Sequence, residues 1–375
     1  MIVKLDNVVN RITGNEDRFT TNLEYFIGGE HYDSENPIIT NRGIIRSEKG
    51  NLLGFKFHFP FKKGDVLFMA RNPHLKKAGM VTFDGICSDA SYILRTKDEK
   101  VLLQDFLPFI IQNEKMWQFF EANKSGSVNY LMNWKELKNY EFNLPPLEEQ
   151  KKLAKTLWQI VDTMESYKKL LAKTDEIVIS KFDEILLNET RTIQIKDLVD
   201  LQINKIKKDT KINEINYIDI SSIDKDTKRI IGTTKYSIKE APSRALQIVH
   251  KNDLLISTVR PNLKTIAINY SEELNTIAST GFCVLRAKKC PVNYLFGIVN
   301  SNVFTNQMIS EATGISYPAV NDKNILDFKI PDIDKQLQND LAIFVQKSEE
   351  SKSAIQASLD SLKQVYKKII TEKLG

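Results

Sequence analysis

The chain repeats itself once, and this duplication limits its possible folds more than any other feature of the sequence. Residues 63–68 (KGDVLF) return 188 positions later as residues 251–256 (KNDLLI). The same separation relates Pro73, Leu75, Lys76 and Gly126 to Pro261, Leu263, Lys264 and Gly314. A period of this length is too long for a solenoid and is typical of two duplicated domains.

The separation between the two copies changes along the chain. Residues 93–95 (ILR) match residues 284–286 (VLR) at a separation of 191. Near the end of each half, the matched positions are separated by 186: residues 142–145 with Leu147 and Gln150 match residues 328–331 with Ile333 and Gln336. Such changes indicate loop insertions, so we expect one fold twice, with different loops.

Within each half, the residue pattern changes once. Residues 1–145 and 191–331 alternate short β-branched or aromatic runs with turn signals, which is typical of mixed α/β modules. Residues 146–190 and 332–375 contain almost no glycine or proline and place apolar residues at steps of three and four, which predicts two long helices. The expected fold class is therefore α+β, with a long helix after each of two tandem modules.

Each predicted helix carries an apolar stripe that needs a partner. The stripes consist of Leu153, Leu157, Ile160, Met164, Tyr167, Leu171, Thr174 and Val178 in the first helix, and of Ile355, Leu359, Leu362, Tyr366 and Ile369 in the second. A helix of some 40 residues is about 60 Å long at a rise of ~1.5 Å per residue. We expect the two helices to pair as an antiparallel coiled coil. Two ordinary core helices in separate domains are the alternative.

The composition, with 42% hydrophobic and 27% charged residues, is that of a soluble globular protein. A net charge of +5 permits a polyanionic partner without requiring one. No apolar run is long enough to cross a bilayer and the chain starts without a signal-peptide pattern, so we expect a cytoplasmic protein with no membrane partner. Cys87, Cys283 and Cys290 lack the spacing of a zinc site, and we expect small buried apolar residues and no metal.

The corner between each module and its helix resembles that of the specificity subunits of type I restriction-modification enzymes. Residues 142–150 read FNLPPLEEQ, and residues 330–336 (IPDIDKQ) keep the first proline and the glutamine but have Asp332 in place of the second proline. The turns at Gly64-Asp65 and Asn252-Asp253 and the segment 241–245 (APSRA) belong to the same resemblance. It covers nearly the whole chain and is weakest over residues 1–60.

The resemblance implies two target-recognition domains, residues 1–145 and 191–331, and two spacer helices, residues 146–190 and 332–375. It implies double-stranded DNA as the ligand, and two methyltransferase subunits and two restriction/translocase subunits as partners. S-adenosylmethionine and ATP with Mg²⁺ are expected in those partners, and no cofactor is expected in this chain. Two modules held apart by a stiff coiled coil could read the two half-sites of an asymmetric bipartite target, and their pseudo-twofold symmetry would offer two equivalent docking faces.

Candidate DNA contacts are side chains that can form paired hydrogen bonds with base edges or bind phosphates. The first segment is the loop at residues 71–77, which follows a predicted strand, and its counterpart is residues 260–264. The second segment is a glycine turn at residues 124–130, and its counterpart is residues 313–317. The candidates are Arg71, Asn72, His74, Lys76, Lys77, Ser127, Asn129, Tyr130, Arg260, Asn262, Lys264, Ser316 and Tyr317, with Arg244 as a further choice. Solvated loop charges are the alternative for each polar residue, and core positions are the alternative for the two tyrosines.

The chain lacks the motifs of a stand-alone enzyme. Its only Pro-Pro pair, Pro145-Pro146, lies between leucines and does not match the (Asn/Asp)-Pro-Pro-(Tyr/Phe) motif of DNA methyltransferases. No phosphate-binding Gly-x-x-x-x-Gly-Lys-(Ser/Thr) loop and no His-Glu-x-x-His metal motif occur. We therefore expect a non-catalytic subunit. Two alternatives stay open: the specificity subunit of a methylation-only or type II-like system, and a coiled-coil scaffold whose end domains bind proteins.

Overall fold

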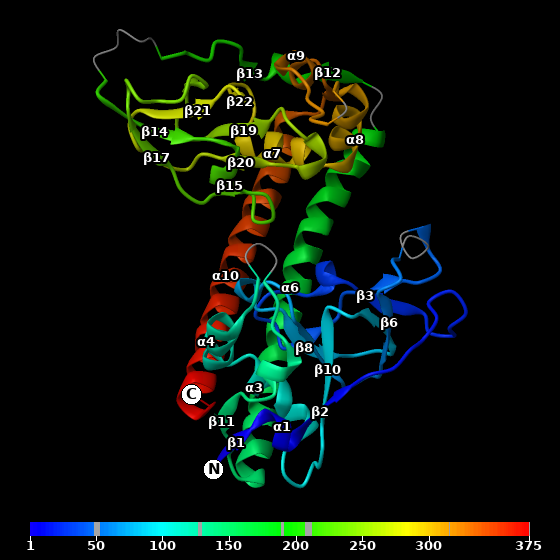
Figure 1. The fold of residues 1–375 in the computed structure, drawn as a ribbon. Coiled ribbons are helices and arrows are strands. Elements are labelled where there is room, and N and C mark those ends of the chain that lie inside the picture. Colours follow the sequence, from blue (N-terminus) through cyan, green and yellow to red (C-terminus); the bar gives the residue numbers. More distant parts are fainter. Residues whose placement is uncertain (49–52, 127–129, 189–190, 207–211, 315, 375) are drawn as a thin grey trace. The chain divides into compact units, whose positions relative to one another are not determined.

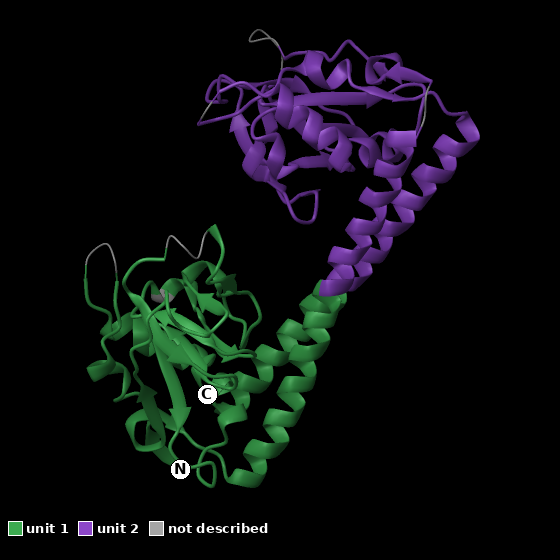
Figure 2. Cartoon of the chain, turned by 90° about the vertical axis from the view of Figure 1, so that its right-hand side faces the viewer, with its two compact units in different colours: residues 1–168, 357–375 green, residues 169–356 purple. Residues whose placement is uncertain are grey.

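The computed structural model describes residues 1–48, 53–126, 130–188, 191–206, 212–314 and 316–374. The chain divides into two compact units, residues 1–168 with 357–375 and residues 169–356, which Figure 2 draws in two colours. Each unit contains one mixed α/β module and parts of both long helices. Along the stretches described, no helix has the length and apolar character needed to cross a membrane.

Unit 1 is built on two sheets and a short strand pair (Figure 1). Its strands are β1 (Ile2–Lys4), β2 (Val9–Ile12), β3 (Tyr25–Ile27), β4 (Ile38–Ile39), β5 (Gly43–Ile44), β6 (Phe57–Phe61), β7 (Val66–Met69), β8 (Ala78–Val81), β9 (Gly85–Ser88), β10 (Ser91–Thr96) and β11 (Glu141–Asn143). The larger sheet has the order β2-β10-β7-β8-β4, the second has the order β5-β3-β9-β6, and β1 pairs with β11. The short helices are α1 (Leu5–Val8), α3 (Leu107–Ile111), α4 (Glu114–Asn123) and α5 (Trp134–Leu137). One core cluster of this unit joins residues of both sheets, among them Ile27, Leu67 and Ile93.

Unit 2 repeats this plan. Its strands are β12 (Thr192–Gln194), β13 (Val199–Asp200), β14 (Glu214–Ile218), β15 (Ile223–Asp224), β16 (Arg229–Ile230), β17 (Thr234–Ser237), β18 (Ala245–Ile248), β19 (Asp253–Ser257), β20 (Ile266–Ile268), β21 (Thr276–Ser279), β22 (Phe282–Ala287) and β23 (Lys329–Pro331). The sheets are β13-β22-β19-β20 and β17-β14-β21-β18, with the pairs β12-β23 and β15-β16. The short helices are α7 (Val292–Asn300), α8 (Asn302–Glu311) and α9 (Asp322–Leu326).

The duplication inferred from the sequence is present in the strand pairing. Each unit contains one parallel pair at the same place in its second sheet, β3 with β9 and β14 with β21. The repeated turn before β7 and β19 has the same left-handed residue, Gly64 with φ 90° and Asn252 with φ 66°. Glycine and asparagine are the residues that adopt this conformation most easily, which explains why the two copies share Lys-(Gly/Asn)-Asp.

The aspartate of this turn makes the same buried ion pair in both units. Arg95 donates two hydrogen bonds to Asp65, at 2.7 and 2.9 Å, and Arg286 donates two to Asp253, at 2.9 and 2.7 Å. Each carboxylate also accepts from the backbone N–H three residues earlier. The second match in the sequence, at a separation of 191, is therefore a pair of equivalent arginines that tie the turn to the neighbouring strand.

The two long helices are α6 (Leu147–Asn188) and α10 (Lys335–Leu374). The start of α6 lies in unit 1 with the end of α10, and the end of α6 lies in unit 2 with the start of α10, so the helices run antiparallel (Figure 2). Of the predicted stripe, Leu157, Met164 and Val178 are buried in α6, and Leu359 and Tyr366 are buried in α10. The predicted fold class, two mixed modules with two paired long helices, is confirmed.

One buried position of α10, outside the predicted stripe, is charged. Lys352 is buried, and its Nζ lies 2.6 Å from Oδ1 of Asp175 on α6 and 2.8 Å from Oε1 of Glu349. Burial alone lowers the pKa of Lys352, but the two carboxylates outweigh this effect and raise the pKa above its ordinary value. A buried ion pair between paired helices favours one alignment of the two helices over its neighbours.

The alignment of the two corners derived from the sequence is wrong by two residues. The pairing Val3 with Phe142 in unit 1 corresponds to Ile193 with Ile330 in unit 2, so Phe142 is equivalent to Ile330 and not to Phe328. The separation is therefore 188 here as well. The shared Phe and Pro letters favoured the shorter separation, although strand pairing and burial follow the longer one.

The same correction applies to the glutamine of the corner. Gln150 is fully buried, and its Nε2 donates to the backbone oxygens of Val101 and Pro145. Its structural counterpart is Gln338, which is also buried and donates to the oxygen of Ile333. The predicted counterpart, Gln336, is exposed and bonds Asp340.

Two of the three cysteines are buried as expected, Cys87 and Cys283, whereas Cys290 is partly exposed. Desolvation raises the pKa of each thiol, to about 12 for Cys290. Within the described part of the chain, no group of three or more His, Cys, Asp or Glu side chains is arranged to hold a metal ion.

Candidate nucleic-acid interface

The loop after β7 has a defined backbone in unit 1. Asn72 and Lys76 have left-handed φ values of 54° and 44°, on either side of a single turn of 3₁₀ helix at Pro73–Leu75. The N–H of Leu75 donates to the oxygen of Asn72 at 3.0 Å, which closes the turn. Left-handed conformations are uncommon outside glycine, so this loop is held by its surroundings rather than left free.

The corresponding loop of unit 2 has the same backbone with different side chains. Arg260 and Lys264 have φ values of 52° and 47° around the turn Pro261–Leu263. Arg260 is therefore equivalent to Asn72, and the residue equivalent to Arg71 is Val259. The two arginines lie in counterpart loops, as expected from the sequence, but at positions that are one residue apart.

The second predicted segment lies beside the first in each unit. Leu131 forms isolated β-bridges with both Arg71 and Ser125, and Ala319 forms the same bridges with Val259 and Thr313. The N–H of Asn72 donates to the oxygen of Tyr130 at 3.1 Å, and the N–H of Arg260 donates to the oxygen of Pro318 at 2.7 Å. The structure thus brings together the two loops that the sequence analysis chose independently. Ser127 and Asn129 lie outside the described residues.

A glycine with positive φ shapes each second segment. Gly126 has a φ of 100° and Gly314 a φ of 98°, values that side-chain-bearing residues rarely adopt. At Gly314 an added Cβ would also lie 3.0 Å from the oxygen of Tyr317. These glycines let the chain turn back so that the following residues reach the first loop.

Each pair of loops contains a cation against a tyrosine ring. In unit 1 the Nζ of Lys124 lies 3.9 Å from the ring centroid of Tyr130, and in unit 2 the Cζ of Arg260 lies 4.7 Å from that of Tyr317. Tyr317 is 69% exposed, so it is not the core residue that was its alternative. Such contacts align flat side chains and leave their outer faces and edges accessible.

A cleft of about 450 Å³ opens beside the first loop of unit 1. Its polar lining includes three predicted residues, Arg71, Asn72 and Lys77. It also includes Lys56, Ser88 and Asp89, which the sequence analysis missed. Lys56 and Asp89 are paired weakly, with 4.0 Å between Nζ and Oδ2. The turn between β9 and β10 was the available signal for Ser88 and Asp89.

Lys56 has a basic counterpart in unit 2. The N–H of Asp89 donates to the oxygen of Lys56 at 3.0 Å, and the N–H of Thr280 donates to the oxygen of Arg244 at 2.9 Å. Since β6 and β18 also pair equivalently with β9 and β21, Arg244 occupies the position of Lys56. The predicted Arg244 therefore belongs to a basic position that both units keep.

Three predicted lysines are engaged within the protein. Lys76 Nζ lies 2.9 Å from Glu35 and 2.7 Å from Glu114, and Lys77 Nζ donates to the oxygen of Gly29 at 2.7 Å. Lys264 Nζ donates to the oxygen of Asn300 and to Oδ1 of Asn302. Burial lowers the pKa of Lys76, but its two carboxylate partners raise the pKa more, whereas burial leaves the pKa of Lys264 lowered. Lys76 and Lys264 thus hold their loops, and a DNA contact by either stays a prediction.

The remaining predicted residues are exposed and free to meet a ligand. These are Arg71, His74, Arg244, Arg260, Asn262 and Ser316. Arg71 and His74 lie on the first loop of unit 1, and Arg260 and Asn262 lie on that of unit 2. The position of His74 corresponds to that of Asn262, so here too the two units differ in the side chain they present.

The chain is similar in sequence and in fold to known proteins. Residues 2–174 match the family described as "Type I restriction modification DNA specificity domain". A chain from a study of complex assembly and conformational transition of the type I R-M system is 16% identical, with a TM-score of 0.51, over 99% of this chain and 96% of that chain. The S subunit of a type I restriction-modification system from M. genitalium is 14% identical, with a TM-score of 0.52, over 99% and 95%.

A third solved structure, the HsdS subunit from Thermoanaerobacter tengcongensis, is 16% identical and covers 99% of this chain and 95% of that chain, with a TM-score of 0.41. The two likenesses with TM-scores above 0.5 show a common fold over nearly the whole chain.

Proposed function

We propose that this chain, a DNA sequence-specificity subunit of the type I restriction-modification family, reads an asymmetric two-part target with one half-site for each unit. The single observation that carries this proposal is the pair of equivalent loops. Their backbones agree at both left-handed positions, but the side chains at the first of these positions differ. Asn72 in unit 1 occupies the position that Arg260 occupies in unit 2. Equal loops with unequal side chains favour two different half-sites.

The chemistry of the loops suits base reading. Arginine forks onto O6 and N7 of guanine, and asparagine pairs with N6 and N7 of adenine in the major groove. In unit 1, Arg71 and Asn72 line one cleft and offer both kinds of contact. In unit 2, Arg260 lies on Tyr317, whose ring limits the orientations of the guanidinium. Lys56 and Arg244 are suited to hold phosphates, which position the protein without reading sequence.

The subunit itself would be non-catalytic. Two methyltransferase subunits would supply S-adenosylmethionine chemistry on a flipped base, and two restriction/translocase subunits would supply ATP-driven translocation and cleavage. The proposal takes these partners, and a location in the cytoplasm with the DNA, from the resemblance to this family. The solved relative from the type I R-M system, whose structure concerns complex assembly, supports association with such partners.

Mapping of methylated bases tests the function as a whole. The chain is co-expressed with the methyltransferase that the proposal expects to be encoded beside it, in a host that lacks modification of its own, and methylated bases are mapped over the genome. We expect one asymmetric motif of two parts with a fixed gap. Co-purification without any sequence preference would instead favour a protein-binding scaffold, and the presence or absence of a restriction gene would separate a type I system from a methylation-only one.

A further inference from the structure

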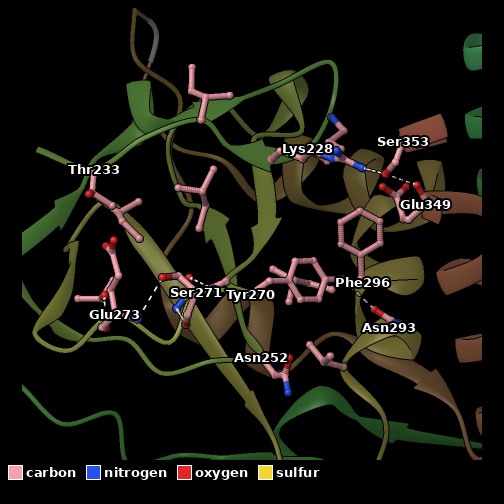
Figure 3. Close-up of a pocket in the computed structure, with 18 of the residues that line it drawn as sticks. Lys228, Thr233, Asn252, Tyr270, Ser271, Glu273, Asn293, Phe296, Glu349 and Ser353 are labelled. Atoms are coloured by element: carbon pink, nitrogen blue, oxygen red, sulfur yellow. Dashed lines mark hydrogen bonds between the residues drawn. The ribbon is translucent and has the colours of Figure 1, made fainter. Parts of the chain in front are cut away.

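A cavity of about 850 Å³ lies in unit 2, away from the loops described above. It is bounded by residues next to the β15–β16 hairpin, by the end of β20, by α7 and by α10. Figure 3 shows Tyr270 and Phe296 at its apolar side, with Glu349 and Ser353 of α10 across from Asn252, Ser271 and Glu273.

The cavity lies at an unpaired sheet edge. The N–H of Asn269 donates to Asp253 at 2.9 Å and the N–H of Ser257 donates to Thr265 at 2.9 Å, so Thr265, Ala267 and Asn269 turn their backbone groups toward β19. Ile268, between them, turns its N–H and C=O to the other side. Among the described residues no hydrogen bond reaches these groups, and Ile268 lines the cavity.

Unit 1 shows what fills this edge in the first copy. There β4 pairs in parallel with β8, Ile38 with Met80 and Ile39 with Val81, and the N–H of Met80 donates to the oxygen of Pro37 at 2.8 Å. By the separation of 188, Met80 corresponds to Ile268. In the described part of unit 2 no strand forms hydrogen bonds with this edge as β4 does in unit 1: β16 lies beside β20, but β15 and β16 pair only with each other.

The side-chain amides beside the two edges, Gln112 and Asn300, also differ in their hydrogen bonding. In unit 1 the side-chain amide of Gln112 donates to the oxygens of Ala78 and Asn36, and so ties β8 to the segment that leads into β4. Its counterpart, Asn300, is 2% exposed, and its Oδ1 has no hydrogen-bond partner in the described structure. The second copy therefore keeps the amide and the edge but lacks the strand.

The charges around the cavity define the occupant further. Lys228 donates to the oxygens of Lys225 and Lys264, and Arg229 donates to Ser353, so both cations are engaged. Glu273 and Glu350 also line the cavity, and within the described residues neither forms a salt bridge. Lys228 and Arg229 keep their positive charges because their partners are neutral oxygens, so the lining carries these two cations beside the two unpaired carboxylates.

We propose that this groove binds a short extended segment of a partner protein, which adds to β20 as a parallel strand at Ile268. Strand addition to an open edge draws its affinity from backbone hydrogen bonds and its selectivity from side-chain pockets. The segment carries two consecutive β-branched aliphatic residues, as Ile38-Ile39 does in unit 1. Because consecutive strand residues point to opposite faces, one of the two packs on Tyr270 and Phe296. A basic residue follows, toward Glu273. This inference does not depend on the DNA-reading function.

The test uses the full chain and a labelled peptide with the sequence of residues 34–42 (SENPIITNR), which contains β4 and Arg42. Gly232 lines the groove, and a Cβ added there meets nothing within 4 Å. A tryptophan at this lining position is therefore accommodated with little risk to folding, and we expect Gly232→Trp to obstruct the groove. Ile268→Pro removes the outward N–H at a strand edge, but it also replaces a buried core side chain and so carries more risk to folding than Gly232→Trp. Leu274→Trp, at a residue that is 82% exposed and is not part of the lining, is the matched control.

Fluorescence anisotropy is expected to show saturable binding of the peptide to the wild-type chain. Gly232→Trp and Ile268→Pro should each raise the Kd about tenfold or more, whereas Leu274→Trp should leave it unchanged. A scrambled peptide of the same composition should not compete. Absence of saturable binding to the wild-type chain would overturn the proposal, and so would equal binding to Gly232→Trp or equal competition by the scrambled peptide.

Discussion

At the scale of single residues, the pairs Asp65–Arg95 and Asp253–Arg286 fix the same turn in both units. Their carboxylates are 3% and 1% exposed, whereas Arg95 is 41% exposed. Removal of one partner from a buried pair leaves the other uncompensated. We expect Asp65→Asn and Asp253→Asn each to lower the free energy of unfolding by roughly 2 kcal/mol, less than for a fully buried pair because the arginines reach solvent. Urea unfolding measures this; Asp162→Asn, at an exposed carboxylate, should change it by under about 0.5 kcal/mol. Equal effects of all three variants would exclude a special role for the pair.

A second prediction at the residue scale concerns the contribution of Lys56 and Arg244 to DNA affinity. A phosphate contact weakens binding on every sequence and adds to its salt dependence. Lys56→Ala and Arg244→Ala should therefore reduce affinity for target and random DNA alike and lower the slope of log K against log salt by about one each. Titrations over a range of salt concentrations check this, with Lys225→Ala, an exposed lysine paired with Asp226, as the control. A loss confined to the target sequence would assign these two residues to base reading.

Three residues predicted from the sequence line one cleft, but the expected equivalence of the two arginines is wrong by one position. Arg71, Asn72 and Lys77 could be predicted as a group because they follow a strand that begins at a recognisable turn. Lys56 was missed because it lies in the first 60 residues, where the two copies share few letters, and only the strand pairing shows that it matches Arg244. The engagement of Lys76 with Glu35 and Glu114 was also invisible, since these partners are distant in the sequence.

At the scale of elements, the paired helices carry one buried cation, Lys352. We expect Lys352→Met to lower the free energy of unfolding by roughly 1–3 kcal/mol, because Asp175 and Glu349 lose their counter-charge. The pKa of Lys352 is raised above 10.5 in the folded chain. Its contribution is therefore complete at neutral pH and is lost only as the pH rises past that value. A double-mutant cycle with Asp175→Asn measures the coupling at pH 7, and additive effects would show that the pair contributes nothing.

A substitution at Leu359 tests how much the apolar stripe of the same helices contributes to stability. It is 3% exposed on α10, within unit 1. A carboxylate there has no partner, so Leu359→Asp should cost about 3 kcal/mol or more and impair co-purification with the methyltransferase. Val365→Asp, at a residue that is 48% exposed on the same helix, is the matched control. Full stability and full complex assembly in Leu359→Asp would contradict the importance of this packing.

The elements themselves were largely predictable from local pattern. Long runs without glycine or proline gave α6 and α10 almost to their ends, because helical periodicity persists over many turns. The alignment of the two corners was wrong because β11 and β23 are only three residues long. In such short strands a few shared letters outweigh the alternation of buried and exposed positions. The missing counterpart of β4 left no signal, since a two-residue strand has no periodicity.

At the scale of the whole molecule, the duplication supports the proposal that one chain addresses two different half-sites. The shared elements set where the loops begin and end, and the side chains at equivalent positions are free to differ. If each unit reads its own half-site, a substitution in one unit should affect recognition of that half-site alone, because variants without shared partners act independently.

The most direct measurement of this claim compares the methylation motifs produced by Arg71→Ala and Arg260→Ala in complex with the methyltransferase. Each lost base contact should cost roughly 1–3 kcal/mol of discrimination. The account predicts that each variant relaxes the sequence requirement in one part of the motif, a different part for each, and leaves the other part intact. Loss of both parts together, or an equal loss of methylation at all sites with the motif unchanged, would contradict it.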